Sequence, residues 1–176
     1  IHIIKYMKKF LFSIAIIFLI STQSFSHVNH YDKYNYLEYE LFRNNEPIGH
    51  HKYDFIRDGD NLSIKSEVNF KITKLGVDLY KYFAKSDENY ENGVFKSYSS
   101  KTKQNKKDRF VNINLDSSNN HLNIEGSSYT GEAEREFIVG TWWNHEIVKA
   151  KAQISGISGR IISVSYTHLT LPTIVR

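Results

Sequence analysis

The chain of 176 residues contains no cysteine, which excludes disulfide bonds, thiol nucleophiles, Cys-based metal sites and lipoprotein anchoring. Its formal charge of +4 arises from Lys5, Lys8, Lys9 and Arg176, so residues 27–164 are neutral and give no electrostatic reason to expect nucleic acid as a partner. This length suits one domain with a core of its own.

The first methionine, Met7, begins a segment with the three parts of a secretory signal peptide. Two lysines follow it, residues 10–20 are mostly apolar, and Ser24 and Ser26 are the small residues that precede a cleavage site. The apolar run is shorter than the roughly 20 residues that cross a bilayer. We therefore predict cleavage between Ser26 and His27, no stable membrane anchor afterwards, and a periplasmic or secreted mature protein.

Both ends of the chain are predicted to lie outside the native domain. Residues 1–6 precede a good start and are interpreted as translated upstream sequence. Residues 165–176 begin with a stretch that resembles translated sequencing-adapter sequence, and an ordinary terminal strand is the alternative. The prediction is a signal peptide at 7–26 and one β domain at 27–164, truncated at its C-terminus.

The dominant pattern of the mature part is alternation of apolar and polar residues with a period of two, which predicts half-buried strands. Residues 62–72 show it most clearly, since their apolar side chains share one face and their lysines and other polar residues share the other. Further strands are predicted at 34–43, 48–57, 77–89, 94–104, 109–115 and 121–125.

The connections between these strands are short and polar. They are rich in Asn, Asp and Gly, the residue types that adopt positive φ in hairpin turns. The predicted fold is therefore mainly β: a meander of about seven antiparallel strands that curls into a half-barrel or open barrel.

The pattern changes towards the C-terminus. Residues 126–140 are predicted to form a loop or a weak edge strand. Asn144 is a helix-capping residue, and apolar residues at helical intervals predict one short helix from about 145 to 153, laid across the open end of the sheet. A turn at 155–159 then leads into a last strand at 160–164.

Four segments carry a resemblance to a known family: 43–49 (RNNEPIG), 97–102 (SYSSKT), 142–144 (WWN) and 154–159 (ISGISG). Together they resemble an uncharacterised secreted, periplasmic family of domains of unknown function. The resemblance implies a half-closed antiparallel barrel, loosely similar to periplasmic carriers of lipids and lipoproteins. It implies no activity and no catalytic residues.

The candidate ligand-binding residues are Trp142, Trp143, Asn144 and His145. Adjacent tryptophans on a turn point in different directions and place a large apolar area in two environments. One is expected to plug the core. The other either packs structurally as well or lines a ligand cavity at the mouth of the barrel, where an indole suits an amphiphile or a sugar.

Metal, cofactor and catalytic sites are not predicted. His50 and His51 are neighbours on a strand and point to opposite faces, so they do not chelate one metal ion together. Glu132, Glu134 and Glu136 alternate on one strand face and are interpreted as solvated. No motif of a known hydrolase or of a phosphate-binding loop is present.

A basic cluster surrounds one predicted hairpin tip. It comprises Lys101, Lys103, Lys106, Lys107 and Arg109. An exposed turn explains such a cluster; contact with anionic headgroups is the functional alternative, preferred over nucleic acid because the domain is neutral and exported.

Three functions follow as hypotheses. The first is an envelope protein that binds an apolar or amphiphilic ligand such as a lipid. The alternative is a structural or interaction protein with a filled sheet and an edge that pairs with an envelope partner. A hydrolase-type enzyme is the third, and it requires a buried titratable group, such as His145 with Glu146 or Glu132.

Overall fold

The computed structural model describes residue 31 and residues 33–164, without the side chains of His145 and Val148. The predicted signal peptide and the two segments predicted to be non-native therefore lie outside the described residues. No helix within the described part has the length and apolarity of a membrane span.

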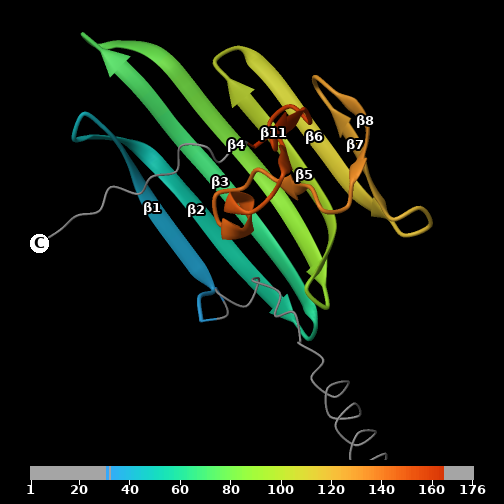
Figure 1. Cartoon of the computed structure of the whole chain (residues 1–176). Helices are drawn as coiled ribbons and strands as arrows, with labels where there is room; N and C mark the ends of the chain where they lie inside the picture. Colours follow the sequence, from blue (N-terminus) through green and yellow to red (C-terminus); the bar gives the residue numbers. More distant parts are fainter. Residues whose placement is uncertain (1–30, 32, 165–176) are drawn as a thin grey trace, which may run out of the picture.

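Eight strands form one antiparallel sheet in which each strand pairs with the next along the chain, and the sheet does not close (Figure 1). The strands are β1 (Tyr36–Arg43), β2 (Glu46–Asp58), β3 (Asn61–Lys74), β4 (Val77–Glu91), β5 (Val94–Gln104), β6 (Lys107–Asp116), β7 (His121–Gly126) and β8 (Thr130–Glu134). This open meander confirms the prediction of a mainly β half-barrel.

The turns between these strands rely on asparagine. With one exception, the described non-glycine residues with positive φ are asparagines. They are Asn44, Asn45, Asn92, Asn105 and Asn120. The exception is Leu75, which has a φ of 51° in the turn between β3 and β4. Asparagine tolerates this left-handed conformation, whereas a leucine is strained in it.

The chain then returns across one face of the sheet as four short elements, which we call the cap (residues 138–163). They are β9 (Ile138–Val139), the 3-10 helix η2 (His145–Val148), β10 (Ala152–Ile154) and β11 (Ile161–Ser163). β10 lies between the other two strands, parallel to β9 and antiparallel to β11. The face that carries the cap is called the inner face, and the opposite one the outer face (Figure 1).

The predicted helix over residues 145–153 is wrong in extent. Asn144 does cap a helix, but η2 is a single 3-10 turn that ends at Val148. Ala152 and Ile154 are buried on one side of β10. Their spacing is a strand period, and the neighbouring strands of the cap satisfy the backbone of this segment. The segment 126–140 contains β8, which makes the large sheet eight-stranded rather than about seven-stranded, and β9, which belongs to the three-stranded sheet of the cap.

Two buried clusters join the cap to the inner face. The first consists of Tyr53, Phe55, Leu62, Ile64 and Tyr90 from the sheet with Trp143 from the cap. The second consists of Tyr98, Val111, Ile113, Leu122, Ile124 and Ala133 from the sheet with Val139 and Ile154 from the cap. The cap is therefore part of the core.

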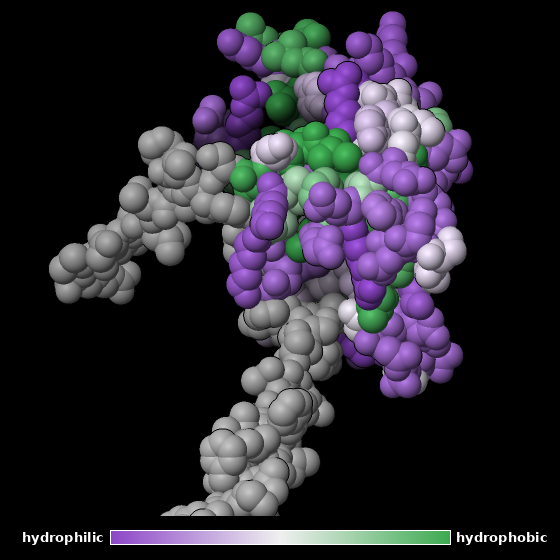
Figure 2. Space-filling view, turned by 45° about the vertical axis from the view of Figure 1, so that its right-hand side comes forward, coloured by the Kyte–Doolittle hydropathy of each residue, from purple (hydrophilic) through white to green (hydrophobic). Residues whose placement is uncertain are grey.

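The inner face continues past the cap towards the β3–β4 turn. We call this part the upper inner face; its apolar residues are all half-buried, namely Leu41, Val68, Phe70, Ile72, Tyr80 and Tyr82. The ring of Phe70 stacks on that of Tyr82, with centroids 5.0 Å apart, and lies 5.8 Å from that of Tyr80. Figure 2 shows apolar residues gathered in the middle of the view and bordered by hydrophilic ones.

Candidate ligand-binding site

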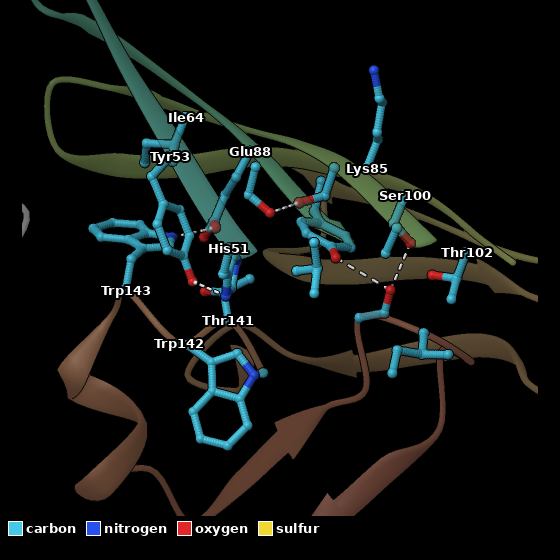
Figure 3. A pocket seen from close by; sticks show the side chains of 18 of the residues that line it. His51, Tyr53, Ile64, Lys85, Glu88, Ser100, Thr102, Thr141, Trp142 and Trp143 are labelled. Atoms are coloured by element: carbon cyan, nitrogen blue, oxygen red, sulfur yellow. Dashed lines mark hydrogen bonds between the residues drawn. The ribbon is translucent and has the colours of Figure 1, made fainter. Parts of the chain in front are cut away.

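A pocket of about 90 Å³ lies where the cap meets the inner face, and we call it the cap pocket (Figure 3). Its polar side chains include His51, Ser66, Ser86, Ser100 and Thr102. Its aromatic side chains are Tyr53, Tyr82, Tyr98, Trp142 and Trp143. The cap pocket therefore offers a ligand both hydrogen-bonding groups and ring faces.

A buried carboxyl group lies beside these residues. Glu88, on β4, is only 2 % exposed. Its Oε1 accepts a hydrogen bond of 2.5 Å from the hydroxyl of Tyr90, and its Oε2 accepts one of 2.8 Å from Nε1 of Trp143. The hydroxyl of Thr141 lies close enough to favour the charged form of Glu88 as well. Both oxygens are thus satisfied inside the protein, as a buried carboxyl group requires.

The protonation of Glu88 is determined by two opposing effects. Burial disfavours the charged form and is the larger one, so the pKa of Glu88 is raised above its ordinary value. The hydrogen bonds from Tyr90 and Trp143, and the nearby hydroxyl of Thr141, favour the carboxylate and reduce that rise. Glu88 therefore holds its proton to higher pH than an exposed glutamate does. Through its hydrogen bond with Trp143, it anchors the cap to the sheet.

His51 is the second perturbed group of the cap pocket. Burial lowers the pKa of its imidazole to about 4, so the ring is neutral at pH 7. The ring of Tyr53 packs against it with centroids 4.2 Å apart, and the tyrosine hydroxyl lies 3.4 Å from Nδ1. A neutral imidazole offers the pocket one donor and one acceptor, depending on the tautomer.

The cap is held to β5 by two hydroxyl groups that converge on one carbonyl. Tyr98 and Ser100 both donate to the carbonyl oxygen of Gly156, at 3.2 and 2.5 Å. A Cβ atom added at Gly156 would lie 2.5 Å from the hydroxyl oxygen of Tyr98. Only glycine therefore permits this approach.

The four predicted ligand-binding residues have different surroundings. Trp143 is 4 % exposed and belongs to the first buried cluster, whereas Trp142 is 89 % exposed and lines the cap pocket. Asn144 caps η2, since its Oδ1 accepts a hydrogen bond of 3.0 Å from the backbone N–H of Glu146. His145 begins η2, and its side chain lies outside the described part of the structure.

Asn144 faces a second pocket instead. This pocket has a volume of about 280 Å³ and lies between the cap and the ends of β5, β6 and β7. Its lining is mainly apolar and includes Val94, Phe95, Leu115 and Phe137, with Arg135 among the polar residues. The structure thus divides the predicted cluster between two pockets rather than bringing it together in one.

A comparison with known families supplies the classification. Residues 39–174 match the model of a domain of unknown function, DUF6134. The chain belongs to this family. No curated protein and no solved structure matches it. The matched range overlaps the segment 165–176. The interpretation of this segment as translated adapter sequence stays a prediction.

Two segments that carried the resemblance have clear structural tasks in this DUF6134 domain. The 154–159 segment contains Gly156, which docks on β5, and Gly159, which adopts a φ of 78° beside β7. The 142–144 segment contains one buried and one exposed tryptophan and the cap of η2. Both segments fasten the cap to the inner face.

Sequence reasoning did not single out Glu88. The signal was its position on β4, where it shares a face with Tyr82, Ala84 and Tyr90. The carboxylates considered for an enzyme are placed elsewhere: Glu132 is exposed, and Glu146 is half-buried and pairs with Lys149 at 3.2 Å.

The two histidines point to opposite faces as predicted, but the three glutamates do not share one strand, because β8 ends at Glu134 and Glu136 lies in the turn that follows. His50 is on the outer face, 3.6 Å from Glu67, while His51 is on the inner face. Glu132, Glu134 and Glu136 are exposed. Within the described residues, no group of three potential ligands gathers for a metal ion.

Proposed function

We propose that this domain is an exported envelope protein that binds an amphiphilic ligand, such as a lipid, on the inner face of its sheet. The observation that carries the proposal is Trp142, an indole that is 89 % exposed at a pocket next to the buried Trp143. The signal-peptide pattern of residues 7–26 supports export to the periplasm or the exterior.

The exposure of Trp142 is unusual for its residue type. Tryptophan is highly buried on average, and its ring combines a large apolar area with one N–H donor. The adjacent Trp143 supplies the indole that the core requires, through its hydrogen bond to Glu88. Trp142 is therefore available to cover an apolar part of a ligand in the cap pocket.

The surroundings of Trp142 favour an amphiphile over a purely apolar ligand. The floor of the cap pocket presents the hydroxyls of Ser66 and Ser86, which lie 3.1 Å apart, and the neutral imidazole of His51. Through Tyr82 the pocket is continuous with the aromatic upper inner face. A polar head in the pocket and an apolar tail along Phe70 and Tyr82 would match both surfaces.

The size of the cap pocket limits what enters it. A volume of about 90 Å³ corresponds to roughly three water molecules. This holds a small polar group and not an acyl chain. The apolar part of the ligand therefore lies outside the pocket, on Trp142 and the upper inner face.

Native mass spectrometry with lipid extraction tests the proposal, on protein purified from the exported fraction. We expect a stoichiometric bound lipid on the wild-type protein. Trp142→Ala should lose it, because the ring that covers the ligand is removed. Ile162→Ala is the matched control, since Ile162 is also an exposed apolar residue of the cap, 46 % exposed, but does not line the cap pocket.

The outcomes separate the two pockets. A ligand that is retained in Trp142→Ala and lost in Val94→Asp would occupy the 280 Å³ pocket, where Val94 lies, and would refute the assignment to the cap pocket. A folded wild-type protein with no bound small molecule would refute ligand binding by the exported protein altogether.

We propose no catalytic role for Glu88. Its two oxygens accept hydrogen bonds from Tyr90 and Trp143, and both donors belong to the buried cluster that supports the cap. A general acid or base must reach its substrate within hydrogen-bonding distance. These two contacts favour an anchoring role over a hydrolase-type reaction.

The edge strand favours a second candidate function, a structural or interaction protein of the envelope. β1 pairs only with β2 in the sheet, so its other edge presents unpaired backbone groups within the described structure. Tyr36, Tyr39 and Phe42 are also exposed on it, at 47, 48 and 58 %. Such an edge is suited to pairing with a strand of an envelope protein. This function would be supported if the purified protein carried no bound small molecule and co-purified with a stoichiometric protein partner.

A further inference from the structure

The hairpin of β3 and β4 ends in an exposed apolar tip. Leu75 is 95 % exposed, Val77 61 % and Leu79 55 %. β3 and β4 have 14 and 15 residues and are the longest strands of the sheet. Figure 1 shows their hairpin at the upper left, at the extremity of the sheet, and Figure 2 shows apolar surface at this upper end.

The leucine at this tip is conformationally unfavourable. Leu75 and Gly76 have φ values of 51° and 77°, and Asn92 and Gly93, in the turn between β4 and β5, have values of 50° and 73°. Asn-Gly is the preferred sequence for a turn with two positive φ angles. The β3–β4 turn instead places a strained leucine in solvent, where its side chain contributes nothing to the core. Strain and exposure together indicate an external contact.

Lysines surround the same end of the sheet. The outer face places Lys71 directly opposite Lys81. Like charges in opposite positions repel each other. Asp78 partly offsets this repulsion, at 3.8 Å from Lys71 and 2.9 Å from Lys81.

Further lysines lie at this end of the sheet. Lys74, Lys103, Lys106 and Lys107 are exposed, and within the described structure they form no ion pair, although Asp108 lies directly opposite Lys103. The β5–β6 turn is tied to the β3–β4 hairpin, since the backbone N–H of Asn105 donates to the carbonyl of Lys81 at 2.8 Å. The basic residues of the β5–β6 turn therefore lie at the level of Lys81, roughly 20 Å along β4 from Leu75 at the usual rise of a strand. They share this end of the sheet with the apolar tip but lie behind it.

The opposite end of the sheet is acidic. Its turns carry Asp58, Asp60, Glu91 and Asp116 at or next to the connections β2–β3, β4–β5 and β6–β7. The neutral residues 27–164 are therefore polarised along the strands, with the positive end at Leu75. A polarised domain orients in the field of a charged surface.

We propose that the β3–β4 tip docks this domain on the surface of an anionic lipid bilayer. Leu75 enters the boundary between headgroups and acyl chains, and the lysines at this end of the sheet are attracted to the anionic headgroups. Charge complementarity selects this partner, because a neutral surface would leave the lysines unused. The inference is independent of the ligand proposed for the inner face.

A fluorescent label at two matched turns tests this docking. The chain has no cysteine, so Leu75→Cys and Asn92→Cys each provide one labelling site, in turns of similar backbone geometry at opposite ends of the sheet. On vesicles of phosphatidylglycerol and phosphatidylcholine, we expect a nitrobenzoxadiazole label at position 75 to brighten about two-fold with a blue shift, and the label at 92 to stay unchanged. If another segment of the chain bound the vesicles, it would not by itself brighten the label at position 75 more than the label at position 92.

The lysines are tested separately by vesicle co-sedimentation. Lys106→Gln with Lys107→Gln should weaken binding to the anionic vesicles on the order of ten-fold. The control is Lys33→Gln with Lys151→Gln, which removes the same charge from exposed positions away from the tip and should not weaken binding.

Three results would overturn the proposal. The first is a label at 75 that does not respond to anionic vesicles or responds no more than the label at 92. The second is equal binding to vesicles of phosphatidylcholine alone. The third is a response at 75 that depends on protein concentration without vesicles, which would assign the tip to self-association.

Discussion

Nε1 of Trp143 donates a hydrogen bond of 2.8 Å to Oε2 of Glu88, which lies 55 residues earlier in the chain. The bond joins the cap to the fourth strand of the sheet, and both partners are buried. A buried polar pair of this kind is worth most when both partners are present, because removal of one leaves the other unsatisfied. It makes the position of the cap specific as well as stable.

Trp143→Phe should therefore destabilise the protein, whereas Trp142→Phe should not. Phenylalanine fills much of the space but leaves Oε2 of Glu88 without its donor, so we expect the free energy of unfolding to fall by about 2 kcal/mol. Trp142→Phe, at an exposed position, should change it by less than about 0.5 kcal/mol. Urea unfolding followed by circular dichroism measures both; equal losses would contradict this account.

Glu88 should make stability decline as pH rises. Its native pKa is raised above the ordinary value of 4.5, so above pH 4.5 the native state binds more protons than the unfolded chain. Stabilisation from this group is complete below pH 4.5 and is lost as pH rises through the native pKa. Glu88→Gln mimics the protonated group and should remove this decline, which denaturant titrations at a series of pH values would reveal. An unchanged pH profile in the variant would refute the role of Glu88.

His51 should act in the opposite direction at lower pH. Its native pKa of about 4 lies below the ordinary 6.5, so the unfolded chain binds more protons between these values. Stability from the neutral ring is complete above pH 6.5 and is lost as pH falls towards 4. Thermal unfolding across this window should show a smaller loss in His51→Phe, which keeps a ring against Tyr53. His50→Phe, on the outer face, is the control; the same reduction in both variants would contradict the assignment.

Most of the sheet could be predicted from the sequence because the patterns that identify its strands and turns lie within short segments of the chain. In residues 62–72 the alternation alone identifies the strand and its buried face, and the asparagines and glycines identify the turns. Adjacent tryptophans likewise imply two environments. Which of the two is buried depends on Glu88, a partner 55 residues away that no local pattern reveals.

The cap was harder to predict for the same reason. Ala152 and Ile154 form a strand because β9 and β11 lie on either side of them, and β9 is separated from β10 by η2. In the sequence alone, the apolar residues of this segment also fit helical spacing. Tertiary pairing determined the outcome, and Asn144 was correct as a capping residue for a helix of one turn.

Gly156→Ala should loosen the cap from β5. The added methyl group would lie 2.5 Å from the hydroxyl oxygen of Tyr98 and force the two apart. We expect a loss of about 1–3 kcal/mol in the free energy of unfolding, the usual range for overpacking. Tyr98→Phe removes the clashing oxygen and the hydrogen bond to Gly156.

The double variant provides the control. If the clash explains the loss, Gly156→Ala combined with Tyr98→Phe should be less destabilised than the sum of the two single variants. Chemical denaturation of all four proteins measures the coupling. Strict additivity would show that Gly156 is required for another reason.

Leu75 links backbone strain to the docking proposed for the β3–β4 tip. Leu75→Asn should raise the free energy of unfolding by about 1 kcal/mol, because asparagine tolerates the φ of 51° and the lost side chain has no packing in the native state. Asn92→Leu, the reverse change in the matching turn, should lower it by a similar amount. A fold selected for stability alone would have asparagine at both turns, so a more stable Leu75→Asn protein that no longer binds anionic vesicles would show that the strain is retained for contact with the membrane. If Leu75→Asn is instead less stable than the wild-type protein in urea unfolding, the leucine has a structural role and its exposure needs another explanation.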